Sequence, residues 1–183
     1  MEQKIKQRFT FLGSLLAAII IIEVINFFTA RSLNYLGLLP RTLSGLTGVI
    51  TAPFLHGSLW HFFSNIIPLA ILGFILSLHG YRNLVLSFVS IVLISGILVW
   101  LFGRSNYHIG ASGLVFGWWA FLLALGYFQR DWKAILTAIV VFIFYGGLLF
   151  SLFSFRSYIS FEYHFFGVIA GILSAWFLAR KKA

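Results

Sequence analysis

The chain has 183 residues, of which 61% are hydrophobic and 9% are charged, and its mean hydropathy is +1.00. A soluble domain is roughly half apolar, so this composition indicates a membrane protein. The absence of cysteine excludes disulfides, a cysteine nucleophile and zinc–thiolate sites. The net charge is +9, but the 13 Lys and Arg are spread between apolar runs, which is typical of topology signals and not of a nucleic-acid-binding surface.

Six apolar runs follow one another along the chain, and a spanning helix needs about 20 such residues. We therefore predict an all-α membrane protein whose residues 1–183 form a single transmembrane domain. The expected helices cover residues 9–29, 57–78, 84–102, 112–128, 132–153 and 164–179.

The basic residues predict the orientation of this bundle. Cytoplasmic loops carry an excess of Lys and Arg, and an N-terminus on the inside gives nine inner charges against four outer ones. Both termini are then cytoplasmic, and the second, fourth and sixth helices begin on the outer side. The inner set is Lys4, Lys6, Arg8, Arg82, Arg130, Lys133, Arg180, Lys181 and Lys182, and the outer set is Arg31, Arg41, Arg104 and Arg156.

Two outer loops stand out by their composition. Residues 30–55 mix glycine and proline with apolar residues, which favours a folded loop lying partly in the membrane interface. Residues 154–163 are aromatic and precede His164, and we interpret them as a cap over a cavity.

The first candidate for chemistry is Ser112, between Gly110 and Gly113 at a loop-to-helix junction. Flanking glycines leave the hydroxyl uncrowded, and the N–H groups of the helix start lie beside any developing oxyanion. The alternative is simple helix packing, because Gly113 and Gly117 form a GxxxG pattern.

His164, at the head of the last apolar run, favours the catalytic interpretation. An intramembrane histidine is costly unless it has a partner. Gly167 and Gly171 share a helix face and predict close approach to the fourth helix, which would bring His164 within hydrogen-bond reach of Ser112. The alternative is an interfacial histidine satisfied by water.

The second helix contributes the segment HGSLWHFFSN. His61 and Asn65 are four residues apart, so on a helix they can direct two N–H donors at one point, as an oxyanion requires. His56 precedes the helix, and we expect it to join the outer loop to the second helix. A metal site is the rival interpretation, but two histidines without a nearby carboxylate or cysteine are a weak ligand set.

With HGSLWHFFSN, GASG and HFFGVIAG in this order, the sequence resembles the rhomboid family of intramembrane serine proteases. The resemblance implies a Ser112–His164 dyad, an oxyanion hole formed by His61, Asn65 and the Ser112 N–H, and a loop shaped by Gly110. Phe116 stands where the family often has tyrosine and is expected to pack against His164.

The resemblance also implies the setting of the reaction. We expect membrane-anchored protein substrates, a bacterial inner membrane and a site open to the outer side, with no metal, no cofactor and no nucleic-acid partner.

Two alternatives from other functional classes remain. A catalytically silent rhomboid-like protein would bind membrane clients without cleaving them. A small transporter would carry polar residues in both leaflets, whereas here they concentrate at the outer helix starts. Glu23, inside the first helix, has either a buried partner or a protonated carboxyl.

Overall fold

The structure is a computed structural model that describes residues 2–152 and 160–179. It confirms the predicted all-helical class, and no β-strand occurs in the described ranges. Five helices are long and apolar enough to cross a membrane, and α6 is a shorter apolar helix. The six apolar helices are α1 (Glu2–Phe28), α3 (Leu59–Leu78), α4 (Tyr81–Phe102), α5 (Ser112–Gln129), α6 (Trp132–Tyr145) and α8 (Phe161–Ala179).

The helix boundaries differ from the predicted ones by three residues or more in four places, one of which is the start of α4 at Tyr81 instead of residue 84. α1 begins at Glu2 and not at residue 9, because the polar residues before the apolar run are good helix formers. α6 ends at Tyr145 and not at residue 153, since Gly146 and Gly147 interrupt it before the short α7 (Leu148–Ser151). α8 begins at Phe161, three residues before His164. Most of the predicted cap, residues 154–159, lies outside the described residues.

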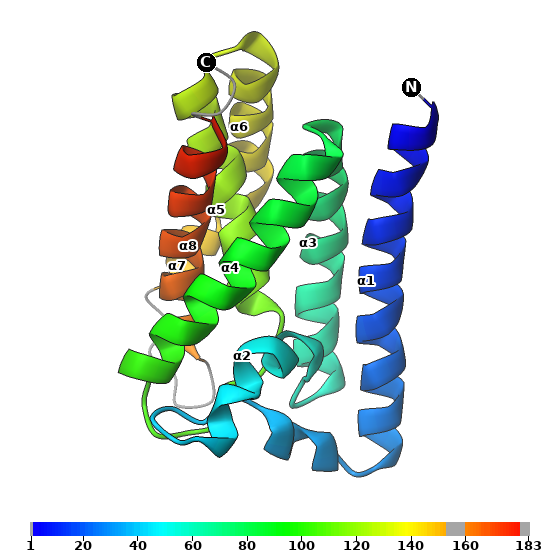
Figure 1. Cartoon of the computed structure of the whole chain (residues 1–183), viewed down its shortest axis with the longest axis vertical. Helices are drawn as coiled ribbons and strands as arrows, with labels where there is room; N and C mark the ends of the chain where they lie inside the picture. Colours follow the sequence, from blue (N-terminus) through cyan, green and yellow to red (C-terminus); the bar gives the residue numbers. More distant parts are fainter. Residues whose placement is uncertain (1, 153–159, 180–183) are drawn as a thin grey trace.

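α5 is the central helix of the bundle (Figure 1). Every side chain from Ser112 to Leu122 is buried, and the helix packs against α3, α4, α6 and α8. α1 lies at one side of the bundle and contacts α3 and α4. The start of α1 and the end of α8 lie at the same end of the molecule.

Glycines let α5 and α8 approach very closely. A methyl group on Gly167 would overlap the carbonyl oxygen of Gly113, and one on Gly171 would overlap that of Gly117. The backbones of the two helices are thus in direct contact, as small residues on facing membrane helices allow. The pairing of these two glycine faces agrees with the sequence pattern.

The long loop after α1 is folded, as predicted. It contains η1 (Ser32–Leu36), η2 (Ser44–Leu46), α2 (Gly48–Thr51) and η3 (Ala52–Phe54). It is bonded to the loop that precedes α5. Leu38 and His108 exchange two backbone hydrogen bonds of 3.0 and 2.8 Å, and the Gly110 N–H donates to the Ala52 carbonyl at 2.9 Å. The loop after α1 therefore supports the backbone in front of Ser112.

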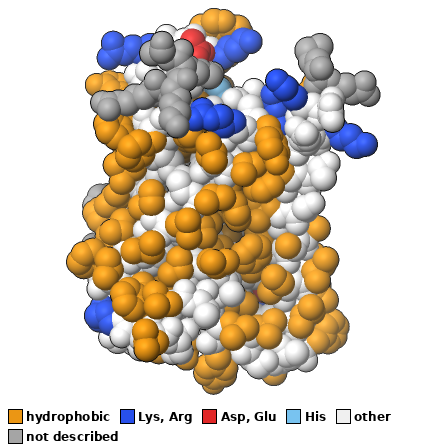
Figure 2. Space-filling view, viewed as in Figure 1, with side chains coloured by type: hydrophobic (Ala, Val, Ile, Leu, Met, Phe, Trp, Pro, Cys, Tyr) orange, Lys and Arg blue, Asp and Glu red, His pale blue; other side chains and the backbone are white. Residues whose placement is uncertain are grey.

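The surface matches a membrane setting. Hydrophobic side chains cover the middle of the face in Figure 2, and most of its visible Lys and Arg lie at the end where α1 begins. Exposed tyrosine and tryptophan occur toward both ends of the bundle, as in the aromatic belts of membrane proteins. One end carries Tyr35, Trp60 and Tyr107, and the other Tyr81, Tyr127 and Trp132.

Candidate active site

Three helices begin at the same end of the bundle, opposite the start of α1 (Figure 1). α3 begins at Leu59, α5 at Ser112 and α8 at Phe161. His61 lies in the first turn of α3 and His164 in the first turn of α8. The predicted site residues thus belong to three segments that are far apart in sequence and adjacent at this end of the fold.

Gly110 fixes the course of the loop that leads to Ser112. Its φ angle is +117°, a conformation that favours glycine. The ring of His61 packs directly against it, because a Cβ atom at this position would lie 2.6 Å from His61 Nε2. Any side chain at residue 110 would collide with His61, so glycine is required here for both its backbone and its size.

Ser112 is the first residue of α5 and its side chain is 8% exposed. The first N–H groups of a helix lack intrahelical acceptors and carry the positive end of the helix dipole. The Ser112 N–H is therefore suited to stabilise a negative oxygen beside the serine hydroxyl.

His164 lies next to the start of α5. Its ring stacks on Phe116, one turn after Ser112, with the centroids 4.2 Å apart and the planes inclined by 16°. The neighbouring Tyr163 packs its ring against Gly113. Among the described residues, no hydrogen bond joins His164 to Ser112, and the buried His164 Nδ1 has no hydrogen-bond partner.

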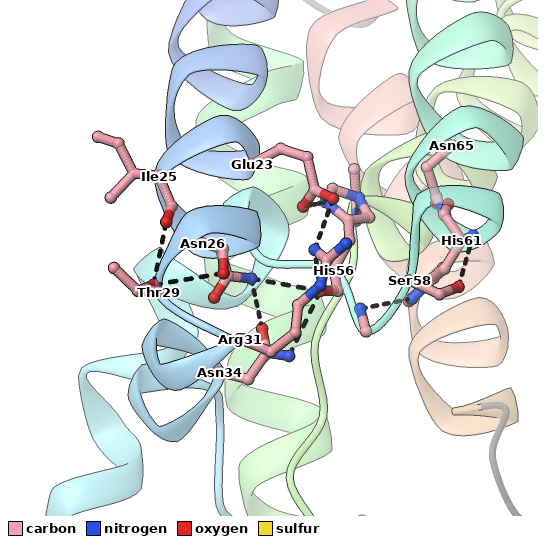
Figure 3. Close-up of polar contacts among 12 residues, drawn as sticks. Glu23, Ile25, Asn26, Thr29, Arg31, Asn34, His56, Ser58, His61 and Asn65 are labelled. Carbon is pink, nitrogen blue, oxygen red and sulfur yellow. Dashed lines mark hydrogen bonds and ion pairs between the residues drawn. The ribbon is translucent and has the colours of Figure 1, made fainter.

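His61 and Asn65 lie one turn apart on α3 (Figure 3). The Gly57 N–H donates to His61 Nδ1 at 3.4 Å, which assigns the ring proton to Nε2, the nitrogen facing Gly110. The Asn65 amide donates one hydrogen to the His61 carbonyl at 2.7 Å and keeps a second N–H for another acceptor. Both side chains thus keep an N–H that their described hydrogen bonds do not use.

His56 connects the loop after α1 to the start of α5. Its ring is fully buried and its Nε2 accepts the Ala111 N–H at 3.4 Å. Burial, with the nearby His61 and Arg31, lowers the pKa of His56 to about 3, so the ring is neutral at physiological pH. The linking role expected for His56 therefore extends to the loop that carries the serine.

Glu23 has a charged partner. Its side chain, 4% exposed, accepts a hydrogen bond of 2.5 Å from the Arg31 guanidinium, and the two form an ion pair (Figure 3). Of the two alternatives that the sequence left open, the structure selects the paired one. Arg31, at the start of the loop after α1, was the one visible candidate for a partner. Nothing in the sequence indicated that the chain folds back there toward Glu23.

A second ion pair was not predicted from the sequence. Arg104, which follows α4, donates to the Glu162 carboxylate from Nε at 2.6 Å and from Nη2 at 3.1 Å. His108 bonds Ser160 at 2.6 Å beside it. These contacts tie the loop before α5 to the first turn of α8, where His164 lies. The pairing joins residues 58 positions apart, for which the sequence carries no local signal.

Metal ligation was the rival interpretation of the histidines. In the part of the chain that the structure describes, no group of three or more His, Cys, Asp or Glu side chains is placed to hold a metal ion.

A family model that describes the Rhomboid domain matches residues 42–181, a range that includes the starts of α3, α5 and α8. The chain belongs to the rhomboid family. As a rhomboid with several membrane-spanning helices, it is an integral multi-pass membrane protein.

Similar proteins occur in mycobacteria. Uncharacterized proteins of Mycobacterium bovis and Mycobacterium tuberculosis are each 36% identical to this rhomboid over 172 residues, which cover 89% of this chain and 72% of the relative. An uncharacterized protein of Mycobacterium leprae is 34% identical over 173 residues, with coverage of 90% and 68%.

Proposed function

We propose that this rhomboid is an intramembrane serine endopeptidase that cleaves membrane-anchored proteins within or near their transmembrane segment. Ser112 is the nucleophile and His164 the general base. His61, Asn65 and the Ser112 N–H form the oxyanion hole. Residues 1–183 act as one rhomboid-type transmembrane domain, and the reaction needs no metal or cofactor.

The single observation that supports this proposal best is the convergence of three helix starts on the loop before α5. His61 of α3 packs on Gly110, and His164 of α8 stacks on Phe116. The contact of Gly113 with Gly167 holds α5 against α8. A nucleophile, a base and N–H donors are therefore gathered at one end of the bundle, as acyl transfer requires.

The chemistry follows from these positions. His164 accepts the Ser112 hydroxyl proton as Oγ attacks the scissile carbonyl carbon, and the new oxyanion accepts hydrogen bonds from His61, Asn65 and the Ser112 N–H. The protonated His164 then donates to the leaving amine, and water, activated by the same ring, hydrolyses the acyl-enzyme. The Ser112–His164 hydrogen bond forms on substrate binding, because catalytic hydrogen bonds often tighten only in the Michaelis complex.

The proposed setting is a bacterial inner membrane with cytoplasmic termini and a site open to the outer side. Support comes from the basic residues at the end where α1 begins, which include Lys4, Lys6 and Arg82. Substrates would reach the site from the bilayer, and no nucleic acid takes part.

One observation favours a second candidate, a silent rhomboid that binds membrane clients. Among the described residues, no hydrogen bond joins the Ser112 hydroxyl to the His164 ring. One experiment on the purified protein separates the two functions.

We expect purified protein in detergent to cleave a fluorogenic transmembrane peptide. Ser112→Ala and His164→Ala should each abolish cleavage, and the double variant should be no worse than either single, because nucleophile and base act as one unit. The measurement is the initial rate for all four proteins, with bound peptide quantified in parallel. Peptide binding without cleavage by the wild type would establish the silent alternative.

A further inference from the structure

Glu23 lies on α1, outside the three helices that form the proposed site, yet its carboxylate points toward that site. Arg31 contacts one oxygen, Oε1. To reach it the chain turns through Ala30 and Arg31, whose φ angles of 51° and 66° are unusual for residues other than glycine. The backbone is thus folded into a less favourable conformation that brings a cation back to Glu23.

The second carboxylate oxygen faces the His56 ring. Glu23 Oε2 lies 3.8 Å from His56 Nδ1, and neither buried atom has a hydrogen-bond partner among the described residues. Because His56 Nε2 accepts the Ala111 N–H, the proton of the neutral ring is on Nδ1, directed at the carboxylate. In the opposite tautomer, Nε2–H would face the Ala111 N–H and the Nδ1 lone pair would face the carboxylate. Both contacts would be repulsive.

The His56 backbone is held from the same side. Its carbonyl accepts three hydrogen bonds, two of 3.3 Å from the amides of Asn26 and Asn34 and one of 3.1 Å from Arg31 (Figure 3). These bonds anchor the His56 backbone to α1 and the turn that follows it. The ring itself lies between the Glu23 carboxylate on one side and the Ala111 N–H on the other.

We propose that Glu23 is a positioning residue of the active site. Paired with Arg31, it holds His56 in the tautomer whose Nε2 accepts the Ala111 N–H, and so fixes the backbone that presents the Ser112 hydroxyl and N–H. This inference rests on the proposed function and adds a residue of α1 to it. A carboxylate in a membrane helix is costly, and this role accounts for its presence.

Two substitutions test the role. Glu23→Gln keeps the shape and an acceptor for Arg31 but removes the charge that faces His56. Glu23→Asp keeps the negative charge that pairs with Arg31, but its side chain is one methylene group shorter, so the carboxylate lies farther from His56. This second variant keeps the test available if Glu23→Gln does not fold. The matched control is Ser77→Ala, which removes an equally buried polar group at the other end of the bundle, one bonded only to the Phe74 carbonyl within its own helix.

The readouts are kcat and KM for a transmembrane peptide and the rate at which a fluorophosphonate modifies the protein. Glu23→Gln should lower kcat and the modification rate about 10-fold, less than the loss that a displacement of about 1 Å causes. KM should stay within about twofold, because remote substrate contacts are unchanged. Ser77→Ala should match the wild type in all three.

A double-mutant cycle with His56→Gln separates positioning from a merely structural role. If Glu23 acts through His56, the Glu23 substitution should cost nothing further in kcat once His56 is replaced. Independent, additive losses would overturn the proposal, as would an unchanged modification rate in Glu23→Gln and Glu23→Asp.

The proposed function and this inference fail in different ways. A wild type that is not modified at Ser112 would refute the protease itself. A wild type that is modified normally, alongside Glu23 variants modified at the same rate, would refute only the role of Glu23.

Discussion

At the scale of single residues, hydrogen bonds determine which atoms of the site can donate. The sequence spacing placed His61 and Asn65 on one helix face, but it could not assign the imidazole proton. The Gly57 N–H occupies Nδ1 and leaves Nε2–H facing Gly110, and the Asn65 amide keeps one hydrogen after donating to the His61 carbonyl. These are the two side-chain donors that we propose for the oxyanion hole.

We therefore expect Asn65→Ala and His61→Ala to lower kcat more than they raise KM. Charge develops on the carbonyl oxygen only in the transition state, so the lost donor acts mainly there. The cost should be at most about 10²- to 10³-fold in rate for each, roughly 2.7 to 4 kcal/mol. Activity should remain measurable, unlike that of Ser112→Ala.

The measurement is kcat, KM and the melting temperature on the same preparations. Full kcat in both variants with normal melting would remove these residues from the oxyanion hole. A parallel loss of activity and melting temperature would assign them a structural role instead.

At the scale of secondary-structure elements, the contact between α5 and α8 decides whether Ser112 and His164 lie near each other. The carbonyl oxygens of Gly113 and Gly117 on α5 lie against Gly167 and Gly171 on α8. Helix association in a bilayer depends on close packing, because lipid is as apolar as the helices themselves. Gly167 and Gly171 therefore allow the close contact between the helices that carry the two halves of the proposed dyad.

A methyl group at Gly171 tests this contact. In Gly171→Ala the Cβ would overlap the Gly117 carbonyl and lie 3.1 Å from the Ala120 Cβ, which forces the helices apart. Overpacking of this kind costs about 1 to 3 kcal/mol. We expect a lower melting temperature in detergent and slower cleavage.

Gly13→Ala is the matched control, because a Cβ there would meet nothing within 4 Å. It should be neutral or stabilising, as alanine is the better helix former by about 1 kcal/mol. Equal melting temperatures for the two variants would show that the glycine contact between α5 and α8 is not tight.

At the scale of the whole molecule, the sequence predicted what depends on local pattern. Apolar length and basic flanks indicated the helices, and glycine spacing indicated the α5–α8 pairing. Two features resisted prediction for physical reasons. Gly146 and Gly147 end α6 inside an apolar run that composition alone would continue. The Arg104–Glu162 pair forms only when segments 58 residues apart fold together, and the Glu23–Arg31 pair forms only when the chain turns back after α1.

The same distinction applies to the proposed site. Motifs identified Ser112, His164, His61 and Asn65, because each lies in a short pattern at a helix start. The contribution of Glu23 was not predictable, since it reaches the serine loop through His56, 33 residues along the chain, and Ala111, 55 residues beyond that. Such relays are set by the fold and not by spacing in the sequence.

The most direct test of the account is the identity of the residue that a fluorophosphonate modifies. Folded wild-type protein in detergent should form one adduct, which peptide mass spectrometry should locate on Ser112, and Ser112→Ala should form none. The phosphonate resembles the tetrahedral intermediate, so modification requires an activated nucleophile and not merely an exposed serine. An unmodified wild type, an adduct on another residue, or equal labelling of Ser112→Ala would contradict the proposed protease.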